Sequence, residues 1–103
     1  MTDPEKLIVY YSMILYLHKD YENALNLLNR YAKDIKGGII YQANVQRILG
    51  LILQTKDDTV NDAMEAFQKA EKLYNQANSQ YGKALSRYSM GLILQTKNAL
   101  LHK

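Results

Sequence analysis

The side chains of this chain that could carry out chemistry are few, and the densest group is Asp57, Asp58, Asn61 and Asp62. Several oxygen ligands in one turn are typical of calcium loops. An EF-hand loop that starts at Asp57, however, needs glycine at its sixth position and an acid at its twelfth. Those positions hold Asp62 and Gln68. We therefore interpret the group as the cap and acidic first turn of a helix, where negative charge complements the helix dipole.

The other reactive groups are too sparse to build a catalytic site. The chain has no cysteine and only two histidines, His18 and His102, so thiolate metal sites, disulfides and paired-histidine sites lack their residues. Gly37-Gly38 is not followed by the Gly-Lys-Ser/Thr of a phosphate-binding loop. We predict that these glycines end a helix with left-handed backbone. We expect no enzymatic activity, no metal and no cofactor.

Composition indicates one folded domain. The 103 residues are 48 % apolar and 22 % charged, with a formal net charge of +3. These values are ordinary for a globular chain of one domain. The chain has no run of five or more basic residues, so we expect no nucleic-acid binding. The longest apolar stretch, Leu7–Leu17, is shorter than the about 20 residues that span a membrane, and it lacks the flanks of a signal peptide. We expect the protein in the cytoplasm, or alternatively in the nucleus.

The elements that position these residues are predicted to be helices. Apolar residues recur at steps of three and four, which predicts helices over residues 4–17, 21–36, 39–55 and 60–77, and from 80 to near the C-terminus. Asp3 and Pro4 suit the start of the first helix, and Asp58 or Thr59 suits the cap of the fourth. No segment has the alternation of a strand. The predicted fold class is all-α, with about five helices.

The chain contains an internal repeat. The segment Gly50–Lys56 recurs unchanged as Gly91–Lys97, 41 residues later, and Ala43 corresponds to Ala84 in the weaker match upstream. A period of this length fits a hairpin of two helices of about 15–20 residues each. The predicted organisation is therefore a hairpin over residues 4–37, a second over 39–77, and one unpaired helix over 79–101.

These features resemble the tetratricopeptide repeat (TPR), in a variant with a period near 40 residues. The resemblance rests on a small residue in the first helix of each hairpin and an alanine–bulky–alanine pattern in the second. Small residues are needed where helices cross at about 8–10 Å. The family's closing proline is absent, and the first copy lacks the glycine. The residues expected to pack the repeats are Ser12, Ala24, Leu28, Gly50, Ala63, Phe67, Ala70 and Gly91. The resemblance implies antiparallel hairpins stacked as a short right-handed solenoid, a single domain over residues 1–103.

The resemblance also implies a concave groove, lined by the first helices, that binds a partner protein or peptide. The expected groove residues are Lys6, Val9, Met13, Tyr16, Asn44, Arg47, Leu51, Gln54, Leu85, Tyr88, Leu92 and Gln95. They suit an extended or helical peptide, with Arg47 opposite an acidic group. Leu51 and Leu92 are equally expected in the core. The family's clamp for a terminal carboxylate is not expected, because its positions hold Val9, Met13, Ile48, Leu85 and Ser89.

The last predicted helix has no following helix to cover the second copy of the repeat. The first copy precedes a helix that carries Phe67, whereas only Asn98–Lys103 come after Lys97. The alternatives to groove binding are therefore a homodimer through this helix, a fragment of a longer helical-repeat scaffold, or a helix supplied by another protein. The residues predicted for self-association are Leu92, Ile93, Leu94, Leu100 and Leu101.

Overall fold

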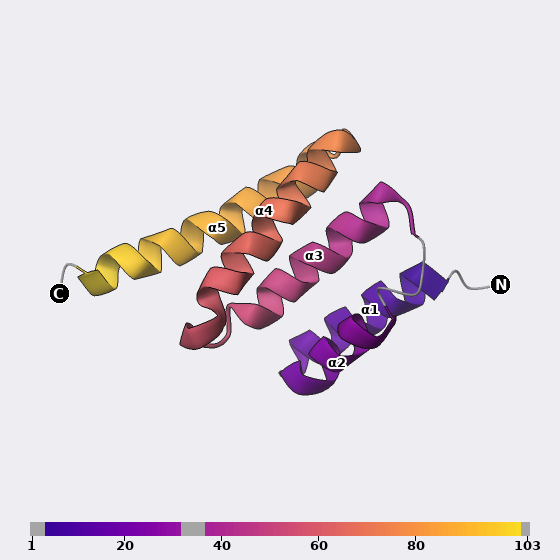
Figure 1. The fold of residues 1–103 in the computed structure, drawn as a ribbon, viewed down its shortest axis with the longest axis horizontal. Coiled ribbons are helices and arrows are strands. Elements are labelled where there is room, and N and C mark those ends of the chain that lie inside the picture. Colours follow the sequence, from indigo (N-terminus) through magenta and orange to yellow (C-terminus); the bar gives the residue numbers. More distant parts are fainter. Residues whose placement is uncertain (1–3, 32–36, 102–103) are drawn as a thin grey trace.

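The computed structural model describes residues 4–31 and 37–101, with side chains at 4–30 and 37–98. Over these residues the chain is all-helical, without strands, as Figure 1 shows. The elements are α1 (Pro4–Leu17), α2 (Tyr21–Tyr31), α3 (Ile39–Leu53), the short 3-10 helix η1 (Asp57–Thr59), α4 (Val60–Gln76) and α5 (Gln80–Leu101). The all-α class and the five predicted helices are confirmed. The predicted cap Asp3 and the predicted continuation of the second helix over residues 32–36 lie outside the described residues.

The turns after α1 and α4 are made by non-glycine residues in left-handed conformation. Lys19 has φ 62° and Asn78 has φ 57°. After α1, the Asp20 N–H donates to the Leu15 carbonyl at 2.8 Å, which is the bond of a Schellman motif. Gly38, predicted to be left-handed, is instead extended, with φ −67° and ψ 174°. The reason is that it occupies the N-cap position of α3, which requires extended backbone.

The helices pack in the order of the chain. The helix α3 packs against α1 on one side and α4 on the other, and α5 packs on α4, as Figure 1 shows. Smaller contacts join α2 to α3 and α3 to α5. The molecule measures 53 × 31 × 19 Å, and the shortest dimension fits two layers of helices, each about 10–12 Å across. Thus α1, α3 and α5 contact one another in succession.

Small residues occupy the helix crossings, but not all at the predicted positions. A Cβ atom on Gly50 would lie 2.8 Å from the Phe67 ring, so α3 and α4 approach closely at this glycine. The α4–α5 crossing uses Gly82, where a Cβ would lie 2.3 Å from the Tyr74 ring. A Cβ on Gly91 would meet nothing within 4 Å. Gly91 therefore does not pack a crossing, because no described helix covers its side of α5.

The other predicted packing residues lie in the core. Ala24 and Leu28 join the cluster between α1, α2 and α3, and Ala63 and Phe67 join the cluster between α4 and α5. Ala70 packs with Ala43 and Tyr74. Ser12 is fully buried, and its hydroxyl donates to the Ile8 carbonyl of its own helix at 2.7 Å. Because the hydroxyl is satisfied locally, serine acts there as a small residue that lets the neighbouring helices approach.

Candidate interaction surface

A cavity of about 380 Å³ lies between α1 and α3. Three predicted groove residues line it: Lys6 and Val9 from α1, and Asn44 from α3. The other lining residues are Glu5, Tyr10, Gly38, Ile40 and Tyr41. Since Lys6, Tyr10 and Ile40 are exposed, this cavity opens to solvent and presents an apolar wall beside an amide and a cation.

A second cavity, of about 440 Å³, lies where the C-cap of α3, η1 and the start of α4 meet α5. Two predicted groove residues line it, Gln54 at the C-cap of α3 and Leu92 from α5. The remaining lining residues are Asp57, Val60, Ile93, Thr96 and Lys97. Leu92 is 45 % exposed, so its side chain is available to a ligand in this cavity. Five predicted groove residues thus line two cavities, one at each junction between first helices.

Three other predicted groove residues contribute mainly to the core. Met13 and Tyr16 are half-buried against the cluster between α1, α2 and α3. The ring of Tyr16 lies 5.8 Å from that of Tyr21, centroid to centroid. Leu51 is half-buried against the cluster that contains Phe67. These side chains form the floor between the helices rather than an exposed groove wall.

Arg47, predicted as the central cation of the groove, is held by α4. Its Nε–H donates to the Tyr74 hydroxyl at 3.2 Å, and that hydroxyl in turn donates to Oδ1 of Asn44. Tyr74 is itself buried. The network holds the side chains of Arg47 and Asn44 in place. To bind a ligand, each would have to exchange a hydrogen bond within the protein for one to the ligand.

The predicted residues of α5 fall into different environments. Tyr88 is 67 % exposed, Gln95 is exposed and Leu85 is half-buried. Of the predicted self-association residues, Leu92 and Leu94 are 45 % and 50 % exposed. Ile93 is buried against Ala63 and Phe67 and is not accessible to a second copy. The side chains of Leu100 and Leu101 lie outside those described.

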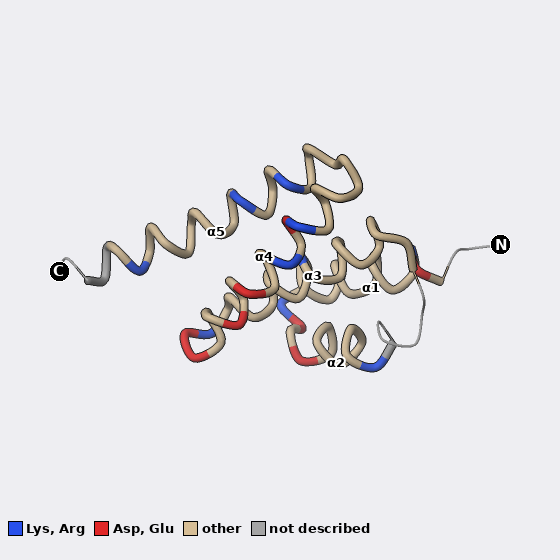
Figure 2. The backbone as a smooth tube through the Cα atoms, turned by 45° about the horizontal axis from the view of Figure 1, so that its top comes forward, with Lys and Arg blue, Asp and Glu red and all other residues tan. Residues whose placement is uncertain are grey.

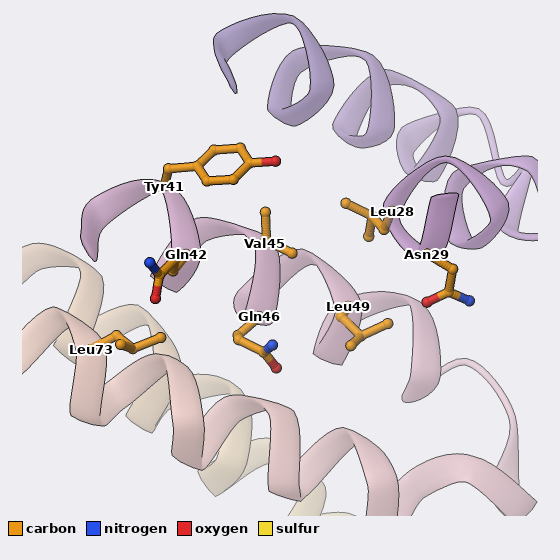
Figure 3. A pocket seen from close by; sticks show the side chains of 8 residues that line it. All are labelled: Leu28, Asn29, Tyr41, Gln42, Val45, Gln46, Leu49 and Leu73. Carbon is orange, nitrogen blue, oxygen red and sulfur yellow. The ribbon is translucent and has the colours of Figure 1, made fainter. Parts of the chain in front are cut away.

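A third cavity, of about 240 Å³, lies between α2, α3 and α4, as Figure 3 shows. Its lining residues are Leu28, Asn29, Tyr41, Gln42, Val45, Gln46, Leu49 and Leu73. The hydroxyl of Tyr41 is buried and has no hydrogen-bond partner among the described residues. Burial raises the pKa of Tyr41 above its usual value of 10.0, and the nearby charge of Glu5 raises it further. Nothing in the sequence pattern singles out this tyrosine.

An exposed apolar face on α1 was not predicted from the sequence. Its members are Leu7, Tyr10, Tyr11, Ile14 and Leu17, which are between 48 % and 68 % exposed. Their steps of three and four place them on one side of the helix, away from the buried Ile8 and Ser12. The signal was present in the apolar run, but a run that is apolar all round does not reveal which face is buried.

The described residues were also compared with the requirements of metal sites and membrane spans, and the chain with known proteins. Over the described residues, no group of three or more His, Cys, Asp or Glu side chains could hold a metal ion. No helix in that part of the chain is both long enough and apolar enough to cross a membrane. No family model, no curated protein and no solved structure matches this chain.

Proposed function

We propose that this chain is a non-enzymatic, TPR-like module that binds a partner peptide in a groove along α1, α3 and α5. One observation carries the proposal: residues expected to line a groove lie in two open cavities at the α1–α3 and α3–α5 junctions. The succession of contacts between first helices is the arrangement that stacked hairpins of a solenoid would produce. A location in the cytoplasm or nucleus accompanies this proposal.

The two cavities are joined by one line of residues along α3 and its C-cap. Asn44 lines the first and Gln54 the second, and Arg47 and Leu51 lie between them at steps of three and four residues. Residues with this spacing lie along one face of a helix. A single elongated ligand on this face of α3 could therefore reach both cavities.

The lining residues indicate the chemistry of the ligand. Val9, Ile40 and Leu92 offer apolar contact area, and each cavity holds one cation and one acid: Lys6 with Glu5, and Lys97 with Asp57. A peptide with apolar anchors and flanking residues of both charges matches this arrangement, since aromatic and aliphatic anchors supply most of the binding energy in such grooves. Arg47 is a weaker candidate for an acidic contact, because it is already bonded to the Tyr74 hydroxyl.

The proposal is tested by selecting binders from a displayed library of random peptides and measuring their affinity by calorimetry. We expect Lys6→Glu and Leu92→Ser each to weaken the selected peptides by about tenfold or more, which is the usual effect of losing one anchor. Gln76→Glu, an exposed position at the end of α4, is the matched control. Peptides that bind both groove variants as tightly as the control would contradict the proposed groove.

A further inference from the structure

The helix α5 carries an uncharged stripe in which large and small residues alternate. The stripe consists of Tyr81, Ala84, Tyr88, Gly91, Gln95 and Asn98. All six residues are exposed, with Tyr81 at 77 % and Tyr88 at 67 %. Their alternating steps of three and four are the spacing of the contact positions in a coiled coil. The two tyrosines would project as knobs, Ala84 leaves a notch between them, and Gly91 leaves a second notch after Tyr88.

The charges of α5 lie outside this stripe. The helix carries three cations and no acidic residue, and Figure 2 shows these cations along α5. All three bind side chains of α4: Lys83 Nζ to Asn75 Oδ1 at 3.1 Å, Arg87 Nε to Glu71 Oε1 at 2.9 Å, and Lys97 Nζ to Asn61 Oδ1 at 2.7 Å. The stripe itself therefore carries no charge, and Arg87, which precedes Tyr88 in the chain, lies at its border.

The same chain shows how an equivalent stripe is covered. On α3, Gly50 lies under the Phe67 ring and Ala43 packs with Tyr74. Residues 43 and 50 correspond to 84 and 91 in the repeat. The covering helix α4 returns along α3 as the second arm of a hairpin. Its two rings, at 67 and 74, have the same separation along the chain as the two small residues that they cover.

We propose that α5 pairs antiparallel with α5 of a second copy of this chain. Tyr81 and Tyr88 of one copy would lie against Gly91 and Ala84 of the other, as Phe67 and Tyr74 lie against Gly50 and Ala43 within the chain. The separation of residues 81 and 88 equals that of residues 84 and 91, so both notches are filled in both copies. The interface is isologous and closes as a dimer.

A second copy fits better than an unrelated helix because the knobs and the notches lie on the same stripe. A helix without this alternation would leave either the tyrosines or the notches unfilled. The proposal is also independent of the groove: Tyr81, Ala84 and Gly91 line neither groove cavity. Tyr88 and Gln95 belong to both the predicted groove and the stripe, and neither lines a groove cavity.

Sedimentation equilibrium from low micromolar to millimolar concentration tests the pairing. We expect a monomer–dimer equilibrium that Gly91→Glu, which fills the notch, and Tyr81→Ala, which removes the knob, each weaken by at least about tenfold, because every substitution occurs twice in the dimer. Both variants should retain the monomer fold, since a Cβ on Gly91 meets open space and Tyr81 is exposed. Tyr10→Ala, which removes an exposed tyrosine from α1, is the matched control.

A chain that remains monomeric over the whole range would overturn the proposal. So would a dimer that tolerates both α5 variants, or one that dissociates in the Tyr10→Ala control instead. The groove is judged separately, because peptides that depend on Lys6 and Leu92 should bind Tyr81→Ala with unchanged affinity. Loss of dimerisation with retained peptide binding and loss of peptide binding with retained dimerisation are therefore distinguishable.

Discussion

The segments Gly50–Lys56 and Gly91–Lys97 have the same seven residues and lie in different surroundings. Their isoleucines behave alike: Ile52 and Ile93 are 4 % and 7 % exposed, each packed on the helices that precede it in the chain. Their glycines differ, because Gly50 lies against the ring of Phe67 whereas Gly91 faces open space. One side of this segment is therefore covered by preceding helices, and the other side is covered only where a later helix returns along it.

The two segments also end differently. The helix α3 stops at Leu53, whereas α5 continues through its copy of the segment to Leu101. Thr55 donates to the Ile52 carbonyl at 2.7 Å, and Thr96 donates to the Leu92 carbonyl at 3.0 Å, so the threonine bonds its own helix in both copies. Since the seven residues are identical, the difference in helix length comes from outside the segment.

The most damaging substitution removes the ring that distinguishes the two copies. Phe67→Ala should lower the free energy of unfolding by about 3–5 kcal/mol, because it leaves a cavity in place of a fully buried side chain. The matched variant Tyr88→Ala should change monomer stability by less than about 0.5 kcal/mol, since that ring is exposed. Urea unfolding at low protein concentration measures both. Equal losses would show that α5 is covered in the monomer as α3 is.

An intermediate effect comes from the same substitution in each copy. Gly50→Ala should destabilise the chain by about 1–3 kcal/mol, because its Cβ would lie 2.8 Å from the buried Phe67 ring. Gly91→Ala should stabilise the monomer by about 0.5–1 kcal/mol, because alanine favours the helix and no atom obstructs it. Thermal unfolding should therefore give shifts of opposite sign. The same sign in both variants would contradict the different surroundings of the two glycines.

An effect as small as that of Gly91→Ala lies upstream of the identical segments, where Tyr41 corresponds to Gly82 in the repeat. Tyr41→Phe should raise the free energy of unfolding by about 1 kcal/mol at neutral pH, because it removes a buried hydroxyl without a described partner. The raised pKa means that the folded state holds this proton more tightly than the unfolded state. This tighter proton binding adds to the free energy of unfolding in full below pH 10.0. The added stability is lost as the pH rises through the folded-state pKa.

The measurement is urea unfolding at neutral pH and again above pH 10.0. Wild type should lose more stability over that interval than Tyr41→Phe does. Tyr10→Phe, at an exposed position, serves as the control and should behave as wild type does. If Tyr41→Phe loses as much stability as wild type, the hydroxyl is solvated or bonded in the folded chain.

Helix existence and order could be predicted from the sequence because local signals specify them. Proline at the start of α1 and the polar residues around Asp20 and Asn78 break the apolar pattern where the turns occur. The prediction of left-handed glycine was wrong at Gly38. Glycine marks a break between two helices, but it does not reveal whether the residue ends the first helix or begins the second. There it begins α3 rather than ending a helix.

The candidate surface could be predicted only in part, because periodicity identifies a face but not its neighbour. Lys6, Asn44 and Leu92, three of the predicted groove residues, line cavities. The bond from Arg47 to Tyr74 joins residues of two helices, and no pattern within either helix reveals it. The α5 stripe was also missed, since the apolar residues of α5 favoured Ile93, which is buried.

The order of the helix contacts has a consequence for how the chain folds. The extensive contacts all join helices that are adjacent or next but one along the chain. Low sequence separation of contacts favours fast folding, because little loop entropy is lost before a contact forms. The α3–α4 hairpin, which has the largest of these contacts, is the natural nucleus. Structure would spread from it in both directions, and amide hydrogens in α1 and the far end of α5 would exchange first.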